Sequence, residues 1–390
     1  MTALRWEEAR DRVRHLLAER PPRTSESIAL EEAHGRILAE DLHADRPYPP
    51  FPRSTRDGFA VRASNLPGQL TLIGEVRAGE PAEIEVGDGQ AVEIMTGAPA
   101  PSGADAILMV EHAQREGDQI RTDRRLTPGD NVAATGSEAV YGSRVLCAGT
   151  RLDYAHIAVA ATVGADPIQV MARYTVSIVA TGDELVEAGH QPQAHQIRNS
   201  NSLSLAAQVR AAGGEVAFRT VAPDTREGLR AAIDRAFDSD VVLFSGGVSA
   251  GKYDLVEGIL AEYGAEFFFT RVLIQPGQPA VFGRAKEKFF FGLPGNPIST
   301  MITFELFARQ AIDASTLPLA VAKLAVPFHH KTGLTRFLPA TVSESGEVVT
   351  PVSWRGSGDV FSVAQANAFL IADCDRAEWA AGDSIRVLKR

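Results

Sequence analysis

Apolar residues recur at helical spacing near the start of the chain and then give way to prolines. From Trp6 to Leu17 they line one face of a predicted helix, which ends before the prolines at 21–22. A second helix is predicted over 30–38. Residues 46–52 contain four prolines, which the interior of a helix does not accommodate. The pattern therefore predicts two helices followed by an extended crossover.

Short apolar runs separated by glycine turns follow from about Asp57 to Gly149. They predict strands at 70–73, 91–95, 106–110, 119–122 and 143–146. Helical spacing returns at 153–165, so the β-rich stretch interrupts a helical region. We predict an N-terminal helical and linker domain of residues 1–50 and 150–173, carrying an inserted β-rich domain of residues 51–149.

Beyond Tyr174, strand-like runs alternate with helical segments. The predicted strands cover 175–180, 215–221, 241–244, 266–273, 280–283 and 288–291, and the helices cover 202–212, 226–236, 255–263 and 297–312. This alternation is typical of a parallel sheet with helices on both faces. Short strands return at 325–326, 337–342, 348–351, 369–372 and 384–388. The fold class is a multidomain α/β protein, with a doubly wound α/β domain at 174–317 and a small C-terminal β domain at 318–390.

Composition narrows the class of protein. The chain has 390 residues, 45% hydrophobic and 23% charged, and this length needs more than one core. No apolar run approaches the roughly 18 residues that span a bilayer, and the first residues lack the apolar centre of a signal peptide. We expect a cytoplasmic protein with no membrane partner. A net charge of -10 without a basic cluster argues against nucleic acid as a partner.

Cysteine, histidine and serine offer little for other kinds of site. Cys147 and Cys374 lie far apart in the sequence, and the nine histidines show no metal-ligand spacing. Ser245 and Ser249 occupy a glycine-rich stretch without a Gly-x-Ser-x-Gly elbow, which argues against a serine hydrolase.

Three strand ends in the α/β region carry loops suited to a ligand. These loops contain Thr181, Gly182 and Asp183; Ser245, Gly246, Gly247 and Ser249; and Pro294, Gly295, Asn296 and Pro297. Asn296 is predicted as a helix N-cap that leaves the N–H groups of Ile298 and Ser299 directed at the pocket. Glycines after a strand are often simply a tight turn, and this alternative stays open for each loop alone. Together, at one sheet edge, the loops predict an oxyanion or phosphate pocket.

Acidic side chains surround the same loops. Glu184, Asp224 and Asp254 each follow a strand or open a helix. They would repel a polyanionic ligand unless a divalent cation bridged them, so the sequence predicts Mg²⁺ here. For Asp224, a plain helix cap before Arg226 is the alternative.

Six motifs occur in an order known from one family. They are Asp-Gly-Phe-Ala-Val-Arg at 57–62, Ile-Met-Thr-Gly-Ala-Pro at 94–99, Thr-Gly-Asp-Glu-Leu at 181–185, Ile-Arg-Asn-Ser-Asn at 197–201, Ser-Gly-Gly-Val-Ser at 245–249 and Leu-Pro-Gly-Asn-Pro at 293–297. On these motifs the chain resembles the molybdopterin molybdenumtransferases, the family that includes MoeA and the E domain of gephyrin. The resemblance extends from about Trp6 to Arg390.

The resemblance implies a fold and an activity. It implies a MogA/MoaB-like central α/β domain, and insertion of molybdenum from molybdate into adenylylated molybdopterin with Mg²⁺-dependent release of AMP. It further implies an elongated homodimer, whose active site lies between the α/β domain of one subunit and the N-terminal region of the other. Implied partners are a molybdopterin adenylyltransferase and the chaperones of molybdoenzymes.

The resemblance also assigns roles to individual positions. It implies catalytic roles for Asp57, Glu184 and Asp254, and Mg²⁺ ligands at Glu184, Asp224 and Asp254. Thr96 and Asp130 would contact substrate, and Pro294 and Pro297 would shape the third loop.

Two departures from the family pattern concern positive charge. The family's Lys-Pro-Gly-Lys-Pro is replaced by Gln275-Pro-Gly-Gln278-Pro, so two cations beside a substrate-binding loop become neutral amides. Two arginines, Arg53 and Arg56, stand before Asp57. If their loop reaches the partner subunit's pocket, they would supply the missing charge.

Two alternatives to an active molybdenumtransferase stay open. The glutamines favour a molybdopterin-binding scaffold or divergent paralogue without molybdate transfer. A related α/β domain carries out molybdopterin adenylylation, so an adenylyltransferase is the second alternative, although the additional domains and Asp57 fit it less well.

Overall fold

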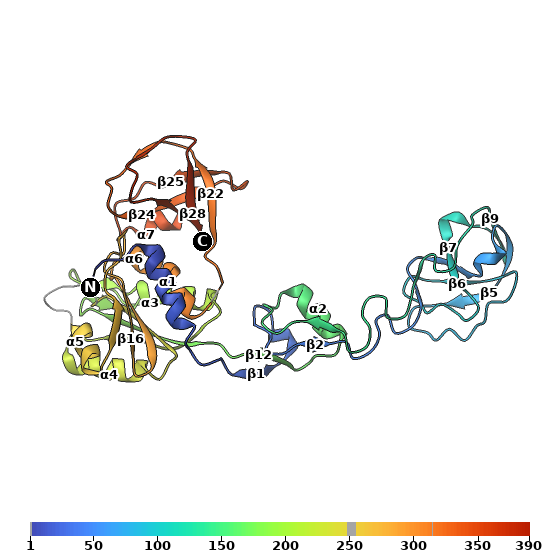
Figure 1. Cartoon of the computed structure of the whole chain (residues 1–390), viewed down its shortest axis with the longest axis horizontal. Helices are drawn as coiled ribbons and strands as arrows, with labels where there is room; N and C mark the ends of the chain where they lie inside the picture. The colour runs from blue at the N-terminus through green and yellow to red at the C-terminus, as the bar shows by residue number, and fades with distance from the viewer. Residues whose placement is uncertain (1, 248–254, 314) are drawn as a thin grey trace. The chain divides into compact units, whose positions relative to one another are not determined.

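The computed structural model describes residues 2–247, 255–313 and 315–390. The chain forms two compact units, one of residues 1–22 with 173–390 and one of residues 23–172 (Figure 1). Among the described helices, none combines the length and the apolar character that a bilayer crossing requires.

The 23–172 unit contains a six-stranded sheet in the order β7-β4-β6-β5-β9-β8. Its strands are β4 (Gly58–Val61), β5 (Gly68–Val76), β6 (Gln90–Ile94), β7 (Ala106–Met109), β8 (Gln114–Glu116) and β9 (Gln119–Thr122). Alternate residues of β4 enter two different cores, Phe59 and Val61 on one face and Ala60 on the other. The β-rich prediction for this stretch is therefore confirmed.

The remainder of this unit is less helical than predicted. It consists of one α-helix, α2 (Tyr154–Thr162), a 3₁₀ turn η1 (Leu30–Glu32), and the paired strands β1 (Ser25–Ile28) with β12 (Ile168–Met171), β2 (Leu42–His43) with β11 (Arg144–Leu146), and β3 (Arg53–Ser54) with β10 (Val132–Ala133). The predicted helix over 30–38 is wrong. Gly35 has a left-handed φ of 76°. Leu38 is extended: its N–H donates to the Thr150 carbonyl, and it lies opposite Val170 in an antiparallel bridge.

Helix α1 (Trp6–Leu17) forms as predicted but belongs to the other unit. Residues 1–22 therefore do not join residues 23–50 in one compact unit, as the predicted N-terminal domain had them. Instead, Trp6, Ala9 and Val13 enter the core of the 173–390 region. Helical spacing identifies the buried face, but it does not identify the core against which that face packs.

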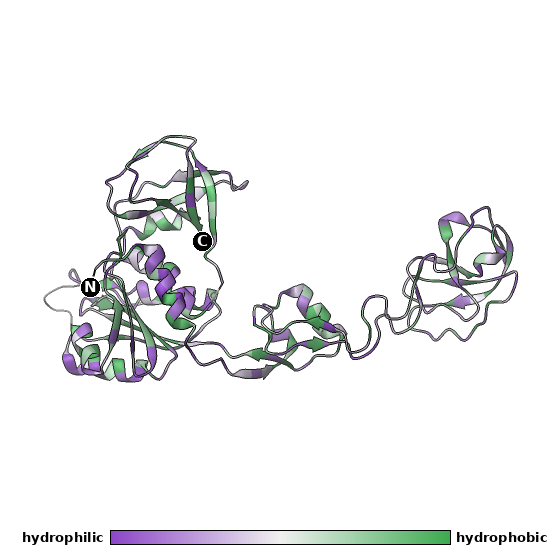
Figure 2. Cartoon of the chain, viewed as in Figure 1, coloured by the Kyte–Doolittle hydropathy of each residue, from purple (hydrophilic) through white to green (hydrophobic). Residues whose placement is uncertain are grey.

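The α/β region forms a mixed sheet in the order β16-β13-β17-β21-β20-β18. The strands are β13 (Thr175–Thr181), β16 (Glu215–Ala222), β17 (Val241–Ser245), β18 (Glu266–Phe269), β20 (Val281–Ala285) and β21 (Lys288–Leu293). Helices α3 (Asn201–Ala211), α6 (Pro297–Leu306) and α1 pack on one face, and α4 (Arg226–Ala236) and α5 (Leu255–Glu262) on the other. The strands are apolar in Figure 2.

The expectation of a parallel sheet holds for four neighbouring strands and fails at one edge. Strands β16, β13, β17 and β21 pair in parallel, whereas β20 is antiparallel to both β21 and β18. A tight turn causes this reversal, because Lys286 and Glu287 both adopt positive φ between β20 and β21.

The C-terminal region is a small β barrel. Strands β22 (Leu319–Leu324), β24 (Thr335–Val342), β25 (Val348–Pro351), β26 (Ala368–Ala372) and β28 (Ser384–Lys389) close into a ring through the β24–β26 pairing. Strand β19 (Ile274–Gln275), from the α/β region, adds to β24. Beside the ring lie α7 (Val360–Ala364) and the pair β23 (Phe328–His329) and β27 (Glu378–Trp379). The strand predicted at 325–326 is wrong, because the strand ends at Leu324.

Gly58→Ala is expected to destabilise the six-stranded sheet. A Cβ at this position would lie 2.0 Å from the carbonyl oxygen of Leu108, and β4 cannot move away because β6 and β7 hold it on both sides. We expect the free energy of unfolding to fall by about 1–3 kcal/mol. Urea denaturation, monitored through the hydrogen exchange of residues 23–172, measures this change. Gly189→Ala, where nothing lies within 4 Å of the added Cβ, is the control. Equal stability of the two variants would contradict the prediction.

Candidate functional site

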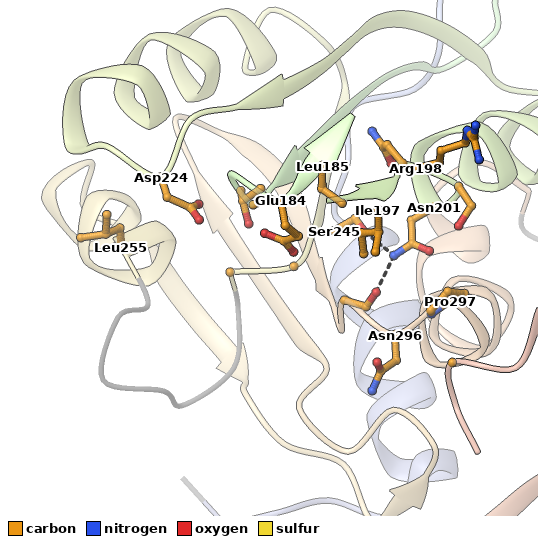
Figure 3. Close-up of a pocket in the computed structure, with 18 residues that line it drawn as sticks. Glu184, Leu185, Ile197, Arg198, Asn201, Asp224, Ser245, Leu255, Asn296 and Pro297 are labelled. Carbon is orange, nitrogen blue, oxygen red and sulfur yellow. Dashed lines mark hydrogen bonds between the residues drawn. The ribbon is translucent and has the colours of Figure 1, made fainter. Parts of the chain in front are cut away.

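A cavity of about 820 Å³ opens at the carboxyl ends of β13, β17 and β21 (Figure 3). All three loops singled out in the sequence line it. They contribute Thr181 and Gly182, then Ser245, Gly246 and Gly247, then Gly295, Asn296 and Pro297. The three loops that were predicted to meet at one edge of the sheet therefore line one cavity. Ser249 and Asp254 lie outside the described residues.

The second loop needs glycine in order to pass close to the first. Gly246 and Gly247 have φ of 85° and 63°, which L residues with side chains rarely adopt. A Cβ on Gly247 would lie 2.6 Å from the hydroxyl oxygen of Thr181. The loop therefore presents bare backbone to the cavity, and the simple-turn alternative does not account for this close approach.

Asn201 joins three walls of the cavity. Its Nδ2 lies 2.7 Å from the Gly295 carbonyl oxygen, 3.1 Å from Ser245 Oγ and 3.3 Å from Thr300 Oγ1 (Figure 3). Its Oδ1 is buried without a hydrogen-bond partner among the described residues. Sequence reasoning missed this role. The signal was the position of Asn201 at the end of a motif and at the start of a helix.

A short parallel pair of strands positions Asn201 at the cavity. Strand β14 (Leu185–Val186), just after Glu184, pairs with β15 (Ile197–Arg198), just before α3. The segment that holds the acid and the segment that holds Asn201 are therefore fastened to each other.

Two carboxylates, Glu184 and Asp224, line the cavity. Asp224 is also tied to the first loop, because its N–H donates to Asp183 Oδ1 at 3.1 Å while Asp183 N–H donates to Asp224 Oδ2 at 3.3 Å. The alternative that Asp224 caps α4 is wrong. Thr225 is the N-cap, and its hydroxyl accepts from the Gly228 N–H.

The carboxylates fit a divalent cation that also contacts ligand phosphates. Among the described residues, no group of three or more His, Cys, Asp or Glu side chains is arranged to hold a metal by itself. Mg²⁺ commonly binds through one or two protein carboxylates together with substrate phosphates and water. Glu184 and Asp224 in one cavity provide that smaller donor set.

A second cavity, of about 570 Å³, adjoins the first at Asn296, which lines both. One wall comes from the α/β region and contains Gln275 to Pro279. The opposite wall comes from the C-terminal region and contains Leu334, Arg336, Trp354, Gly356 and Ser357. The predicted N–H donor of Ile298 is not available to a ligand, because it donates to the Ser357 carbonyl at 3.0 Å.

Arginines accompany both glutamines of this second cavity. Gln275 on β19 stands opposite Arg336 on β24, and the Nε of Arg336 is buried without a partner among the described atoms. With its amide oxygen turned toward Arg271, Gln278 accepts from that guanidinium at 3.0 and 3.2 Å. Arg336 was not predicted from the sequence. Arg53 and Arg56 were proposed instead as the residues that replace the positive charge of the family's two lysines. Arg53 is paired with Glu138 at 2.6 Å within its own unit.

The 23–172 unit carries the other predicted site residues. Thr96 donates to Asp57 Oδ1 from its N–H at 2.7 Å and from its hydroxyl at 2.9 Å. These two hydrogen bonds lower the pKa of Asp57, the backbone bond contributing most. Asp130 is not part of this pair, since its carboxylate accepts from the Thr127 N–H and closes its own turn.

Thr96→Val is expected to raise the pKa of Asp57. The variant removes the hydroxyl donor but keeps the N–H, so the carboxylate loses part of its stabilisation and takes up a proton at higher pH. Titration of Asp57 by carbon-13 NMR measures the change. Thr55→Val is the control, because the Thr55 hydroxyl donates to Asn131 instead. An unchanged Asp57 pKa in Thr96→Val would show that the hydroxyl does not matter.

Asn201→Ala is expected to loosen the cavity wall. Its amide joins the Ser245 and Gly295 loops, so backbone N–H groups at 245–247 and 295–296 should exchange with deuterium faster in the variant. Ser204→Ala, which alters a hydroxyl in the same turn of α3, is the matched control. Equal exchange in both variants would refute the joining role.

Family comparisons cover almost the whole chain. Residues 4–164 match the MoeA N-terminal region (domains I and II), residues 177–314 match a "probable molybdopterin binding domain", and residues 321–389 match the MoeA C-terminal region (domain IV).

Curated and solved relatives agree with these matches. The molybdopterin molybdenumtransferase of Bacillus subtilis is 35% identical over 384 residues, covering 93% of this chain and 89% of the relative. The same enzyme of Staphylococcus aureus MRSA252 is 32% identical, covering 93% and 90%. A crystal structure of a MoeA protein from Pyrococcus horikoshii superposes with a TM-score of 0.82 at 31% identity, covering 100% of this chain and 99% of that one. The chain therefore belongs to the MoeA family of molybdopterin molybdenumtransferases.

Proposed function

We propose that this protein inserts molybdenum from molybdate into adenylylated molybdopterin, with Mg²⁺-dependent release of AMP. Named relatives support a role in molybdenum cofactor biosynthesis and an enzyme of this class. The observation that carries the proposal is the pair of adjoining cavities that share Asn296. A reaction between a large phosphorylated pterin and a small oxyanion needs two such neighbouring subsites.

The first cavity suits the pterin nucleotide. Its volume of about 820 Å³ lies within the range of cofactor pockets, and its glycine loop exposes backbone to phosphate oxygens. Glu184 and Asp224 would hold Mg²⁺, and a bound Mg²⁺ would supply positive charge toward the phosphate groups of the ligand. Asn201 holds the surrounding loops in one arrangement before substrate arrives.

The second cavity suits the oxyanion. Arg336 supplies a cation beside Gln275, and the glutamines offer neutral amide donors where the family has lysines. We infer that molybdate is held mainly by one guanidinium and by neutral hydrogen bonds. Asn296, between the cavities, can contact ligands in both.

Assembly and partners are part of the proposal. We infer a homodimer in which the Asp57–Thr96 pair of one subunit serves the cavities of the other, and partnership with an adenylyltransferase and with molybdoenzyme chaperones. Sedimentation velocity tests the dimer, which a purely monomeric protein would exclude.

The defining experiment is a turnover assay. Purified protein is incubated with adenylylated molybdopterin and Mg²⁺, with and without molybdate, and AMP is measured. AMP release that requires molybdate, and that Glu184→Gln abolishes, supports the proposal. Binding of the nucleotide without AMP release would favour a scaffold, and formation of the adenylyl adduct from ATP would favour an adenylyltransferase.

Gln275→Lys is expected to lower the molybdate concentration needed for half-maximal AMP release by about tenfold. A charge-assisted hydrogen bond contributes roughly 1–2 kcal/mol more than a neutral one. Gln275→Met, of similar size and uncharged, is the control and should raise that concentration. If Lys and Met act alike, Gln275 does not contact the oxyanion.

A further inference from the structure

The N-terminal segment Leu4–Glu7 contacts residues that adjoin both walls of the second cavity. Leu273 N–H donates to the Leu4 carbonyl at 2.7 Å, and the Leu273 carbonyl accepts from Thr335 N–H at 3.0 Å. Leu273 thus lies between the N-terminal segment and β24. It is followed by Ile274, which lines the cavity just before Gln275, and Thr335 directly precedes Arg336 on the other wall.

Trp6 packs against Phe337, the neighbour of Arg336 on β24. Its indole is 2% exposed and meets Phe337 edge-on, with ring centroids 5.8 Å apart and an interplanar angle of 83°. Phe337 is fully buried and adjoins Arg336 on β24. Since close-packed aromatic side chains resist displacement, the indole restricts the position of the strand that carries Arg336.

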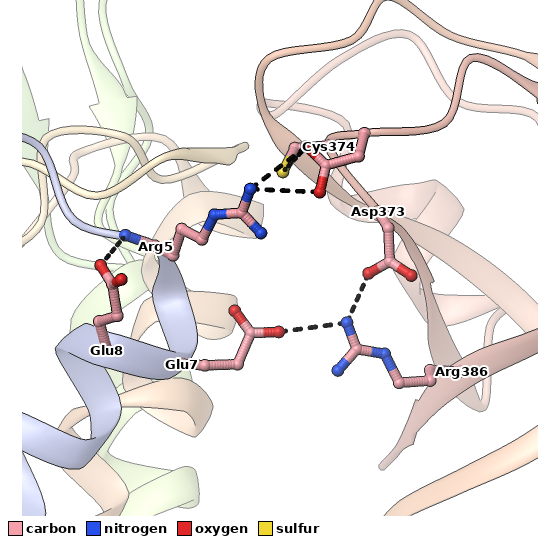
Figure 4. Close-up of polar contacts among 7 residues, drawn as sticks. Arg5, Glu7, Glu8, Asp373, Cys374 and Arg386 are labelled. Carbon is pink, nitrogen blue, oxygen red and sulfur yellow. Dashed lines mark hydrogen bonds and ion pairs between the residues drawn. The ribbon is translucent and has the colours of Figure 1, made fainter.

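Ion pairs hold the same segment against the barrel (Figure 4). Arg5 pairs with Asp375 at 3.2 Å, and Arg386 pairs with Glu7 at 3.2 Å and with Asp373 at 2.5 Å. The Arg386 guanidinium also lies over the Trp6 ring, 5.4 Å from its centroid. Exposed pairs stabilise little individually. Arg386, however, contacts Trp6, Glu7 and Asp373 together and so links the segment to the barrel beside the indole.

We propose that Leu4–Glu7 is a clasp that sets the spacing between the two walls of the second cavity, with Trp6 as its positioning residue. The clasp acts through Phe337 on Arg336 and through Leu273 on the glutamine loop. The ligand assigned to the cavity rests on the proposed function, whereas the clasp itself rests on the contacts above.

The competing explanation is that Trp6 is simply a core residue. A core role predicts that Trp6→Ala lowers stability and affects every ligand site of the unit alike. The clasp predicts a selective effect on the second cavity, because Leu273 and Phe337, which the segment contacts, directly adjoin the lining residues Ile274 and Arg336 of that cavity.

The test compares Trp6→Ala, Trp6→Phe and a control in the full-length protein. Ile233→Ala removes a fully buried side chain from the core on the opposite face of the sheet, so it matches the loss of packing without touching the clasp. Calorimetry gives the dissociation constants of molybdate, as probe of the second cavity, and of AMP, as probe of the first. Hydrogen exchange reports on the Leu273 and Thr335 amides.

In Trp6→Ala we expect molybdate binding to weaken by about tenfold or more while AMP binding changes less than about twofold. Trp6→Phe should restore most of the molybdate affinity. Ile233→Ala should leave both affinities unchanged. Equal weakening of both ligands, or no selective change, would overturn the clasp.

Failure of the clasp and failure of the proposed function give different results. If the wild-type protein does not bind molybdate, the ligand assignment is wrong. The hydrogen-exchange measurement then still tests the clasp. If the clasp exists, the Leu273 and Thr335 amides exchange faster in Trp6→Ala than in the wild-type protein, and they do not in Ile233→Ala. Unchanged exchange in Trp6→Ala would overturn it.

Discussion

Parallel pairing of β13, β17 and β21 is the constraint on which both cavities depend. Parallel strands end at the same edge of a sheet, so three loops that are far apart in sequence must meet there. The glycines at 246 and 247 then allow the loops to approach, and Asn201 joins them. Asn296, on the third loop, extends this edge into the second cavity.

The two cavities differ in electrostatic character. The first is lined by the carboxylates Glu184 and Asp224 together with an arginine, Arg198, whereas the described lining of the second contains Arg336 and neutral glutamines but no carboxylate. A phosphorylated ligand that brings a cation with it suits the first, while an anion without a cation suits the second.

Sequence reasoning succeeded where local pattern determines structure. The helix at 226–236 and the strand at 119–122 have the predicted bounds, because their amphipathic or alternating pattern is also their packing pattern. It failed where contacts with residues distant in the sequence determine the local structure. Leu38 is extended because it hydrogen-bonds with Thr150 and lies opposite Val170 in an antiparallel bridge, and Arg336 reaches the second cavity because β24 pairs with β19. Neither pairing has a signal in the neighbouring residues.

Strand β19 has a consequence for how such a chain can be divided. The C-terminal barrel looks complete in sequence, yet β24 begins against two residues, Ile274 and Gln275, that belong to the preceding region. A barrel separated at residue 318 would leave that stretch of β24 as an open edge, the kind of surface through which sheets associate with other chains. The boundary that family comparison places near residue 321 is therefore not a boundary of backbone hydrogen bonding. A barrel transferred to another protein would therefore need a strand of matching register in place of β19.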